Sequence, residues 1–135
     1  MEATDRYLSA LQHGINTIVD QYNGDPIRET WFVGPHASEG RSGVYKDVCP
    51  CLTKTRAGSG GFYVTNRGTT LSTATMLQLQ GISPKRMLKP PQASTRNFNM
   101  AIGSAMTMPV LCRIMFAELQ SVGLLGCKDR DPFVK

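Results

Sequence analysis

The first periodic pattern of the chain lies near its N-terminus. Apolar side chains recur at steps of three and four residues from Leu8 to Tyr22, which is the spacing of one face of an α-helix. Thr4 suits the N-cap of such a helix, and Gly24 suits its end. Gly14 interrupts the segment, at a cost of about 1 kcal/mol relative to alanine. The pattern predicts an amphipathic helix from Thr4 to Tyr22.

Two shorter runs favour β-strands. Trp31–Val33 is an apolar run of strand type. Phe62–Thr65, with its aromatic and β-branched side chains, is the clearest strand signal in the chain. We expect residues 34–43, between the two runs, to form a loop.

Two further helices are predicted in the C-terminal half. Ser72 can accept backbone N–H bonds at the start of the first helix, and Gly81 supplies the left-handed residue that ends it. A connection rich in proline and lysine follows. Ile102–Ala105 then predicts a tight turn that leads into the last helix, which begins near Pro109 and ends at Gly123. Together these elements predict an α+β fold of three main helices and two or three short strands.

The composition is that of an ordinary globular protein. The chain has 135 residues, of which 41% are hydrophobic and 19% are charged, so we expect a single domain. It contains no apolar run of about 18 residues, and its first residues lack the basic and apolar regions of a signal peptide. We therefore expect no membrane partner and an intracellular location, which would be the nucleus in a eukaryote.

Four cysteines and two histidines are the candidate metal ligands. No cysteine pair has the C-x-x-C spacing, and the Cys49-x-Cys51 pair has no second pair at the distance of a zinc finger. We predict reduced, partly buried thiols and no bound metal. His13 and His36 have no triad partners at a suggestive spacing, and we interpret both as structural or solvated.

The chain is basic. Fifteen Lys and Arg against ten Asp and Glu give a net charge of +5 and an isoelectric point near 9.2, which favours a polyanionic partner. Because salt screens exposed charges beyond about 8–10 Å, only clustered cations steer a phosphate backbone. The cations flank a glycine-rich loop and a diproline: Lys46, Lys54, Arg56 and Arg67, then Lys85, Arg86, Lys89 and Arg96. Two solvated loops are the alternative interpretation.

Three segments carry a resemblance to a known family. Val48–Val64 is similar to a Pro-x-Leu-Thr…Gly-Gly-Tyr stretch, and Leu71–Gly81 is similar to Leu-Thr-x-x-Glu-x-x-x-Leu-Gln-Gly. Arg96–Met106 contains Ile-Gly-Ser-Ala-Met, which is similar to Ile-Gly-Asn-Ala-Val/Met. In this order and spacing, the segments resemble the end of the target-recognition region and the last two conserved blocks of the DNA cytosine-5 methyltransferases. The resemblance covers roughly residues 44–120 of this chain.

The resemblance implies that the chain is a single partial domain, the C-terminal portion of a cytosine-5 methyltransferase-like fold. Residues 1–68 would be the target-recognition-like part, and residues 69–127 would hold the helices of the last conserved blocks. Residues 128–135 would be a tail.

The groups that perform cytosine-5 methylation in the family have no counterpart here. The nucleophilic cysteine belongs to a Gly-x-Pro-Cys-Gln block, whereas Cys51 follows Pro50 but precedes Leu52, within the recognition-region match. The Glu-Asn-Val acid block and the glycine-rich cofactor block after a first strand are absent as well. We therefore name no catalytic residue, and the chain is not expected to methylate alone.

What remains is the part that shapes the DNA cleft and closes the cofactor pocket. Polar and basic side chains would contact DNA, and Gly58–Gly61 would let the backbone approach a phosphate closely, with Phe62 and Tyr63 as anchors. A plain glycine hairpin is the alternative. The candidate DNA-binding residues are Thr53, Lys54, Thr55, Arg56, Gly60, Gly61 and Arg67.

The last block implies a cofactor contact. The candidate residues are Gly103, Ser104, Ala105 and Met106, which would touch S-adenosyl-L-methionine in the complete enzyme. Ser104 stands where the family has Asn, which implies a weakened or rearranged contact. Thr75 replaces the Glu of the preceding block, and Thr69 and Thr70 stand where the family usually carries Arg, so a charge pair that braces the recognition region would be lost.

The last predicted helix carries an apolar stripe too broad for a helix with one exposed flank. In the family this helix packs onto the large catalytic domain, so we expect part of the stripe to lack cover and the chain to self-associate. The stripe consists of Val110, Leu111, Ile114, Met115, Phe116, Leu119 and Val122.

Three hypotheses follow. The first is the C-terminal part of a cytosine-5 methyltransferase-like protein, whose partners are double-stranded DNA and a missing catalytic domain or companion chain. The second is a small basic nucleic-acid-binding module without catalysis. The third is a structural protein with an accidental likeness.

Overall fold

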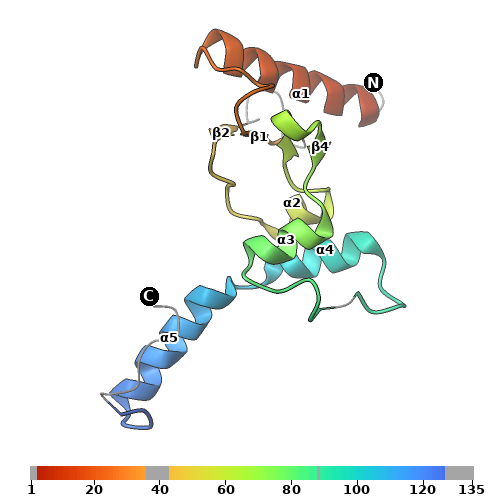
Figure 1. Cartoon of the computed structure of the whole chain (residues 1–135). Coiled ribbons are helices and arrows are strands. Elements are labelled where there is room, and N and C mark those ends of the chain that lie inside the picture. Colours follow the sequence, from red (N-terminus) through yellow and green to blue (C-terminus); the bar gives the residue numbers. More distant parts are fainter. Residues whose placement is uncertain (1–2, 36–42, 88, 127–135) are drawn as a thin grey trace.

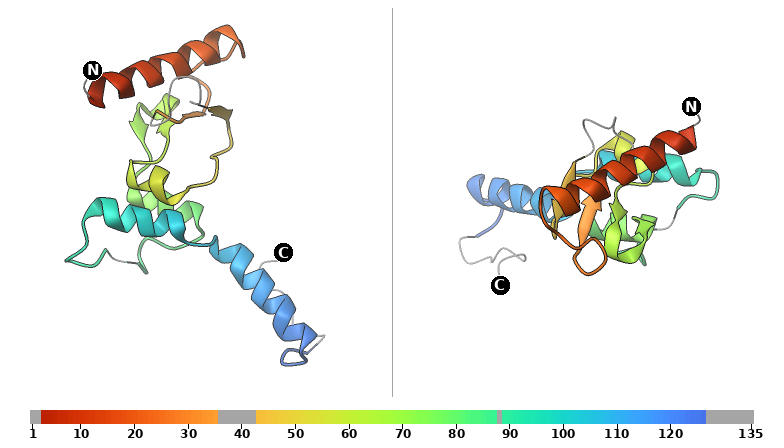
Figure 2. Two further views of the ribbon diagram at one scale, coloured as in Figure 1. Left: turned by 180° about the vertical axis from the view of Figure 1, so that it is seen from behind. Right: turned by 90° about the horizontal axis from the view of Figure 1, so that it is seen from above.

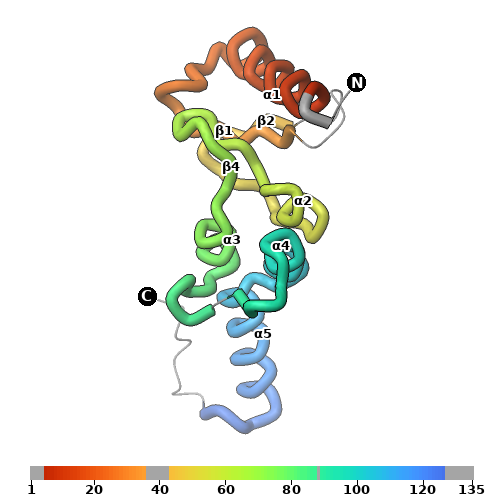
Figure 3. The backbone as a smooth tube through the Cα atoms, turned by 90° about the vertical axis from the view of Figure 1, so that its right-hand side faces the viewer, coloured from red at the N-terminus to blue at the C-terminus, as the bar shows by residue number. Residues whose placement is uncertain are grey.

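The computed structural model describes residues 3–35, 43–87 and 89–126 of the chain. The molecule is elongated, with helix α1 at one end, a small sheet and three helices in the middle, and helix α5 projecting from the other end (Figures 1 and 3). The elements are α1 (Ala3–Asp20), β1 (Trp31–Val33), β2 (Val44–Lys46), α2 (Lys54–Gly58), β3 (Tyr63–Val64), the 3-10 turn η2 (Thr65–Arg67), β4 (Thr69–Thr70), α3 (Thr73–Leu79), α4 (Thr95–Ser104) and α5 (Met108–Ser121).

Several predicted elements are confirmed. The fold is α+β, and α1, β1, β3, α3 and α5 lie where the sequence pattern places them. The oxygen of Ser72 accepts a hydrogen bond of 3.1 Å from the backbone N–H of Thr75, which makes it the N-cap of α3. Gly81 follows that helix in the left-handed conformation, with a φ of +73°.

Other predictions are wrong. The described residues form five α-helices rather than three main ones. Ile102–Ser104, predicted as a turn, is the last turn of α4, and the N-cap Ser94 accepts from the N–H of Asn97 at 3.1 Å. Helix α1 ends through Asn23, which has a φ of +47°, rather than through Gly24. Most of the predicted loop at 34–43, with His36, lies outside the described residues, as does the tail from Cys127 onward.

The sheet is antiparallel, with the strand order β2-β1-β3-β4. Because β3 pairs with β4, the predicted boundary between residues 68 and 69 falls inside the sheet. Helix α1 crosses over β1 and β2 (Figure 2), and buries Ile18 against Trp31 and Val33.

Gly14 lies inside helix α1 because the helix packs closely against strand β1 at this position. A β-carbon added at Gly14 would lie 2.4 Å from Cγ1 of Val33, so only glycine lets α1 approach β1 this closely. The helix-propensity cost of Gly14 is thus offset by the packing of α1 on the sheet.

A second core joins the sheet to α2, α3 and α4. Helices α2 and α4 approach closely at two glycines: a β-carbon at Gly103 would lie 2.5 Å from the carbonyl oxygen of Thr53, and one at Gly58 would lie 2.4 Å from Cγ of Met100. The buried residues of this core are Leu52, Ala57, Phe62, Val64, Leu71, Met76, Leu77, Phe98 and Ile102.

Gln80 connects three helices from inside the protein. Its side chain, only 5% exposed, donates through Nε2 to the carbonyl of Ile102 at the end of α4, at 3.2 Å. Its Oε1 accepts from the hydroxyl of Thr107 at 2.9 Å, and its backbone carbonyl accepts from the N–H of Met108 at 2.8 Å. The C-terminus of α3, the C-terminus of α4 and the start of α5 therefore meet at one side chain.

Helix α5 contains no buried residue. Together, α4 and α5 form one stretch, Thr95–Ser121, which is long and apolar enough to cross a membrane by length and composition alone. The extended backbone of Ala105 divides that stretch, and α4 buries Phe98 and Ile102 in the core. At 1.5 Å per residue, α5 alone is about 21 Å long, which is less than the ~30 Å of a bilayer core.

Replacing Gln80 by leucine tests the connection between the three helices. We expect Gln80→Leu to lower the free energy of unfolding by about 1–3 kcal/mol, because it leaves buried hydrogen-bonding groups without their partner. Urea unfolding followed by circular dichroism measures this loss. Gln78→Leu, the same change at an exposed position of α3, is the matched control and should cost less than about 0.5 kcal/mol. Equal losses for the two variants would contradict the role of Gln80.

Replacing Gly103 by alanine tests the contact of α2 with α4. Alanine normally favours a helix over glycine by up to about 1 kcal/mol. Here the added methyl would meet the carbonyl of Thr53, so we expect Gly103→Ala to destabilise by about 1–3 kcal/mol. Ser104→Ala, at the exposed neighbouring position, should change the melting temperature little. A stabilising Gly103→Ala would show that α2 and α4 are not in close contact.

Candidate nucleic-acid interface

The candidate DNA-binding residues 53–56 begin a helix rather than a loop. Thr53 is the N-cap residue of α2, and its side chain makes no capping hydrogen bond. Thr53, Lys54 and Thr55 are all exposed. Their polar groups are therefore presented to solvent on one short helical turn.

Gly60 and Gly61 form the C-terminal cap of α2. The N–H of Gly61 donates to the carbonyl of Arg56 at 2.8 Å, and the N–H of Gly60 donates to that of Ala57 at 3.1 Å, which is the Schellman pattern. Both glycines have positive φ values, +98° and +75°. Gly61 is also buried, with its Cα against Leu71. Their N–H groups are engaged within the chain, so these residues shape the loop and do not offer donors to a phosphate.

Arg56 is held by the protein itself. Its guanidinium lies 4.7 Å from the ring centroid of Phe62, in a cation–π contact. A β-carbon at Gly34 would lie 2.9 Å from Nη1 of Arg56, so the guanidinium also lies against that glycine. Phe62 is fully buried, which confirms it as an anchor, whereas Tyr63 is only half-buried. Arg56 thus ties α2 to the sheet, in contrast to the exposed Lys54.

Arg67 is exposed in the last turn of η2, just before Gly68, which has a φ of +64°. The remaining cations predicted to flank the glycine-rich loop and the diproline are exposed as well. Lys46 forms an ion pair with Glu29, whose Oε2 accepts from the indole N–H of Trp31 at 3.1 Å. Lys85, Arg86, Lys89 and Arg96 are exposed.

The candidate cofactor residues lie at the end of α4 and just beyond it. Gly103 faces α2 and is used in packing, as described above. The hydroxyl of Ser104 donates to the carbonyl of Met100 at 2.9 Å, so it keeps acceptor capacity only. Ala105 is extended and exposed, and Met106 is exposed as well. Three of the four residues are therefore accessible to a ligand, and Gly103 is not.

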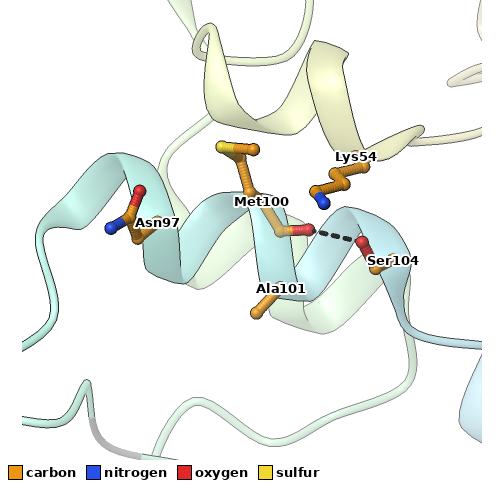
Figure 4. A pocket seen from close by; sticks show the side chains of 5 residues that line it. All are labelled: Lys54, Asn97, Met100, Ala101 and Ser104. Atoms are coloured by element: carbon orange, nitrogen blue, oxygen red, sulfur yellow. Dashed lines mark hydrogen bonds between the residues drawn. The ribbon is translucent and has the colours of Figure 1, made fainter.

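Lys54 and Ser104, predicted to contact different ligands, share one hollow. It has a volume of about 320 Å³ and is lined by Lys54 from α2 and by Asn97, Met100, Ala101 and Ser104 from α4. Figure 4 shows the ammonium of Lys54 beside Ser104, with Met100 against α2. The hollow offers one cation, one amide and one hydroxyl acceptor above an apolar floor. Such a set suits an anionic group that also carries hydrogen-bond donors.

The strongest electrostatic feature is one that the sequence analysis missed. Residues 48–117 contain eight Lys and Arg and no Asp or Glu. Residues 1–47, in contrast, contain four Lys and Arg and seven Asp and Glu. The sequence itself shows this feature, as a run of seventy residues without Asp or Glu. Clusters of Lys and Arg alone do not reveal it, because they do not show where carboxylates are absent.

The structure shows why this separation matters. The ion pairs of Arg28 with Asp25 and of Lys46 with Glu29 lie in the N-terminal part. From α2 to α4, the chain supplies no carboxylate to neutralise its cations. Every charged side chain of α2 and α4 is thus a cation, and α3 carries no charge.

The cysteines and histidines were the candidate metal ligands, and the structure describes most of them. Cys49, Cys51 and Cys112 are free; Cys49 and Cys112 are partly buried, as predicted, whereas the prediction is wrong for Cys51, which is exposed. Among the residues that the structure describes, no three His, Cys, Asp or Glu side chains are grouped closely enough to hold a metal ion. His13 is exposed on α1.

Comparison with known proteins identifies no related protein. No protein-family model matches the chain, and neither a curated protein nor a solved structure resembles it significantly.

Proposed function

We propose that this chain is the DNA-recognition portion of a cytosine-5 methyltransferase-like protein, which holds double-stranded DNA and does not methylate it alone. The observation that carries the proposal is the acid-free run at residues 48–117, with its eight cations. A surface without carboxylates attracts a polyanion, and each cation that neutralises a phosphate releases a counterion.

The packing of the three resembling segments supports the family assignment. Gln80, in the Leu-Gln-Gly segment, donates to the carbonyl of Ile102, in the Ile-Gly-Ser segment. Gly103 packs against the carbonyl of Thr53, which belongs to the first segment. Segments that resemble one family in sequence thus contact one another, as expected if they form one structural unit.

The exposed groups would contact DNA directly. Lys54, Arg67 and the hydroxyls of Thr53 and Thr55 are the contacts that the geometry favours. Arg56 would act as a positioning residue, because it is engaged by Phe62.

S-adenosyl-L-methionine would be bound only with the help of a companion domain. Ser104, Ala105 and Met106 are accessible to it, but the Gly103 surface is covered by α2. The remaining cofactor-binding groups would come from a catalytic domain outside this chain.

Helix α5 supports the need for that companion. Most of its large apolar side chains are exposed, Leu111 and Phe116 are half-buried, and none is buried. Contiguous apolar surface of this kind is typical of an interface rather than of a free monomer surface. The most exposed are Val110 (51%), Ile114 (49%) and Met115 (53%) in the helix, and Val122 (66%) at its C-cap.

A self-sufficient nucleic-acid-binding module is the second candidate function. The two hydrophobic cores favour it, because α1 with the sheet and α2–α4 with the sheet each bury their own apolar residues without another chain. The two candidates share the DNA surface and differ in whether α5 needs a partner.

DNA binding is tested by its dependence on salt. We expect the purified chain to bind duplex DNA, with log affinity falling against log salt concentration by about 0.9 for each neutralised phosphate. Replacing Lys54 and Arg67 together by alanine should flatten the slope by about 1–2, as measured by fluorescence anisotropy. Arg28→Ala, which removes an exposed cation paired with Asp25 in the acidic part, is the control and should leave the slope unchanged. An unaltered slope in the double variant would place the DNA surface elsewhere.

The requirement for a companion is tested on α5. We expect the isolated chain to self-associate and to bind a hydrophobic dye in its native state, because the apolar surface of α5 is uncovered. Met115→Lys should reduce both the dye fluorescence and the weight-average mass from light scattering. Ala117→Lys adds the same charge at an exposed small residue of α5 and should have a weaker effect. A monomer without dye binding would favour the self-sufficient module.

A further inference from the structure

The Cys49-Pro50-Cys51 segment is not used by the proposed function, yet it lines a cavity. This segment belongs to the connection between β2 and α2, which links the sheet to the helices beneath it. The cavity has a volume of about 240 Å³. Besides the three residues of the segment, its walls are Leu52, Leu79, Gln80 and Thr107.

Both cysteines line this one cavity. Burial, and then the charge of the neighbouring Cys51, raise the pKa of Cys49 to about 11. The thiol of Cys49 lies 3.6 Å from the carbonyl of Pro50, to which it donates. Cys51 is exposed, so the pair can be reached from solvent.

The rest of the cavity offers few further ligands. Oε1 of Gln80 and the hydroxyl of Thr107 are already hydrogen-bonded to each other. Leu52 and Leu79 contribute only apolar surface. Within the described residues, no group of three His, Cys, Asp or Glu side chains is available, whereas a structural zinc site needs four protein ligands. The donor set is thus two sulfurs in a wall of mixed polar and apolar surface.

We propose that Cys49 and Cys51 together bind one monovalent copper ion. Thiolates are soft ligands that select Cu(I), and Cu(I) accepts two sulfurs as a complete coordination shell. On binding, two S–H bonds break, two Cu–S bonds form and two protons are released to solvent. The copper keeps its oxidation state, so no oxidant or reductant takes part.

The position of the site gives binding a second effect. The cavity wall includes Gln80, which connects α3, α4 and α5. An ion that bridges Cys49 and Cys51 should bind more tightly to the folded chain, in which both cysteines line one cavity, than to the unfolded chain, in which no wall holds the two side chains. Binding should therefore raise the melting temperature.

Competition with a coloured copper chelator tests the proposal. The full chain, with Cys112 and Cys127 both replaced by serine and its remaining thiols reduced, is titrated under nitrogen into the Cu(I) complex of bicinchoninate. We expect it to withdraw one equivalent of copper and to melt at a higher temperature with copper than without. Cys51→Ser in this background, at an exposed position that should not disturb folding, is expected to weaken copper binding at least tenfold. Cys49→Ser should do the same while its circular dichroism spectrum stays native.

Several results would overturn the proposal. Failure of the double-serine chain to withdraw copper is one, and undiminished binding by the Cys51→Ser variant is another. Displacement of the copper by an equal concentration of Zn(II) would show that the site is not a two-sulfur Cu(I) site. None of these outcomes bears on DNA binding, because the cysteines carry no part of the proposed DNA surface.

Discussion

The buried amide of Gln80 is the interaction on which the C-terminal half of this structure depends. An amide side chain in a core is stable only when its donor and acceptor are both satisfied, because an unpaired buried polar group costs about 1–3 kcal/mol. Gln80 satisfies them with the carbonyl of Ile102 and the hydroxyl of Thr107, which lie at the end of α4 and the start of α5. The need to pair one side chain therefore fixes where three helices meet. An apolar residue of the same size would fill the space without specifying that meeting point.

Local capping chemistry made part of this fold predictable from sequence. Ser72 and Gly81 delimit α3, because an N-cap hydroxyl and a left-handed glycine act on their own helix ends. The same chemistry is present at Ser94, yet α4 was missed. The Ile-Gly-Ser sequence predicts a turn when only local propensity is considered. In the structure, Gly103 lies inside α4 because a larger residue would collide with the backbone of Thr53 at the start of α2.

The candidate site was less predictable than the fold, because side-chain competition decides it. Arg56 and Lys54 are indistinguishable as cations in the sequence. In the structure, Phe62 engages Arg56 while Lys54 stays exposed beside Ser104. Similarly, Gly60 and Gly61 predict a flexible loop by composition, but their N–H groups cap α2. Sequence spacing identifies the residues of a surface, and packing decides which of them remain available to a ligand.

The separation of charge has a consequence for how the molecule meets a polyanion. Residues 1–47 carry seven carboxylates and four Lys and Arg, whereas residues 48–117 carry eight Lys and Arg and no carboxylate. The chain therefore carries an electric dipole directed from α1 towards the helices beneath the sheet (Figure 1). If DNA is the partner, as proposed above, such a dipole would experience a torque in the field of the duplex before any contact is made, and the basic half would turn towards the phosphates during diffusion. The approach would then be oriented, and fewer encounters would occur through the α1 end.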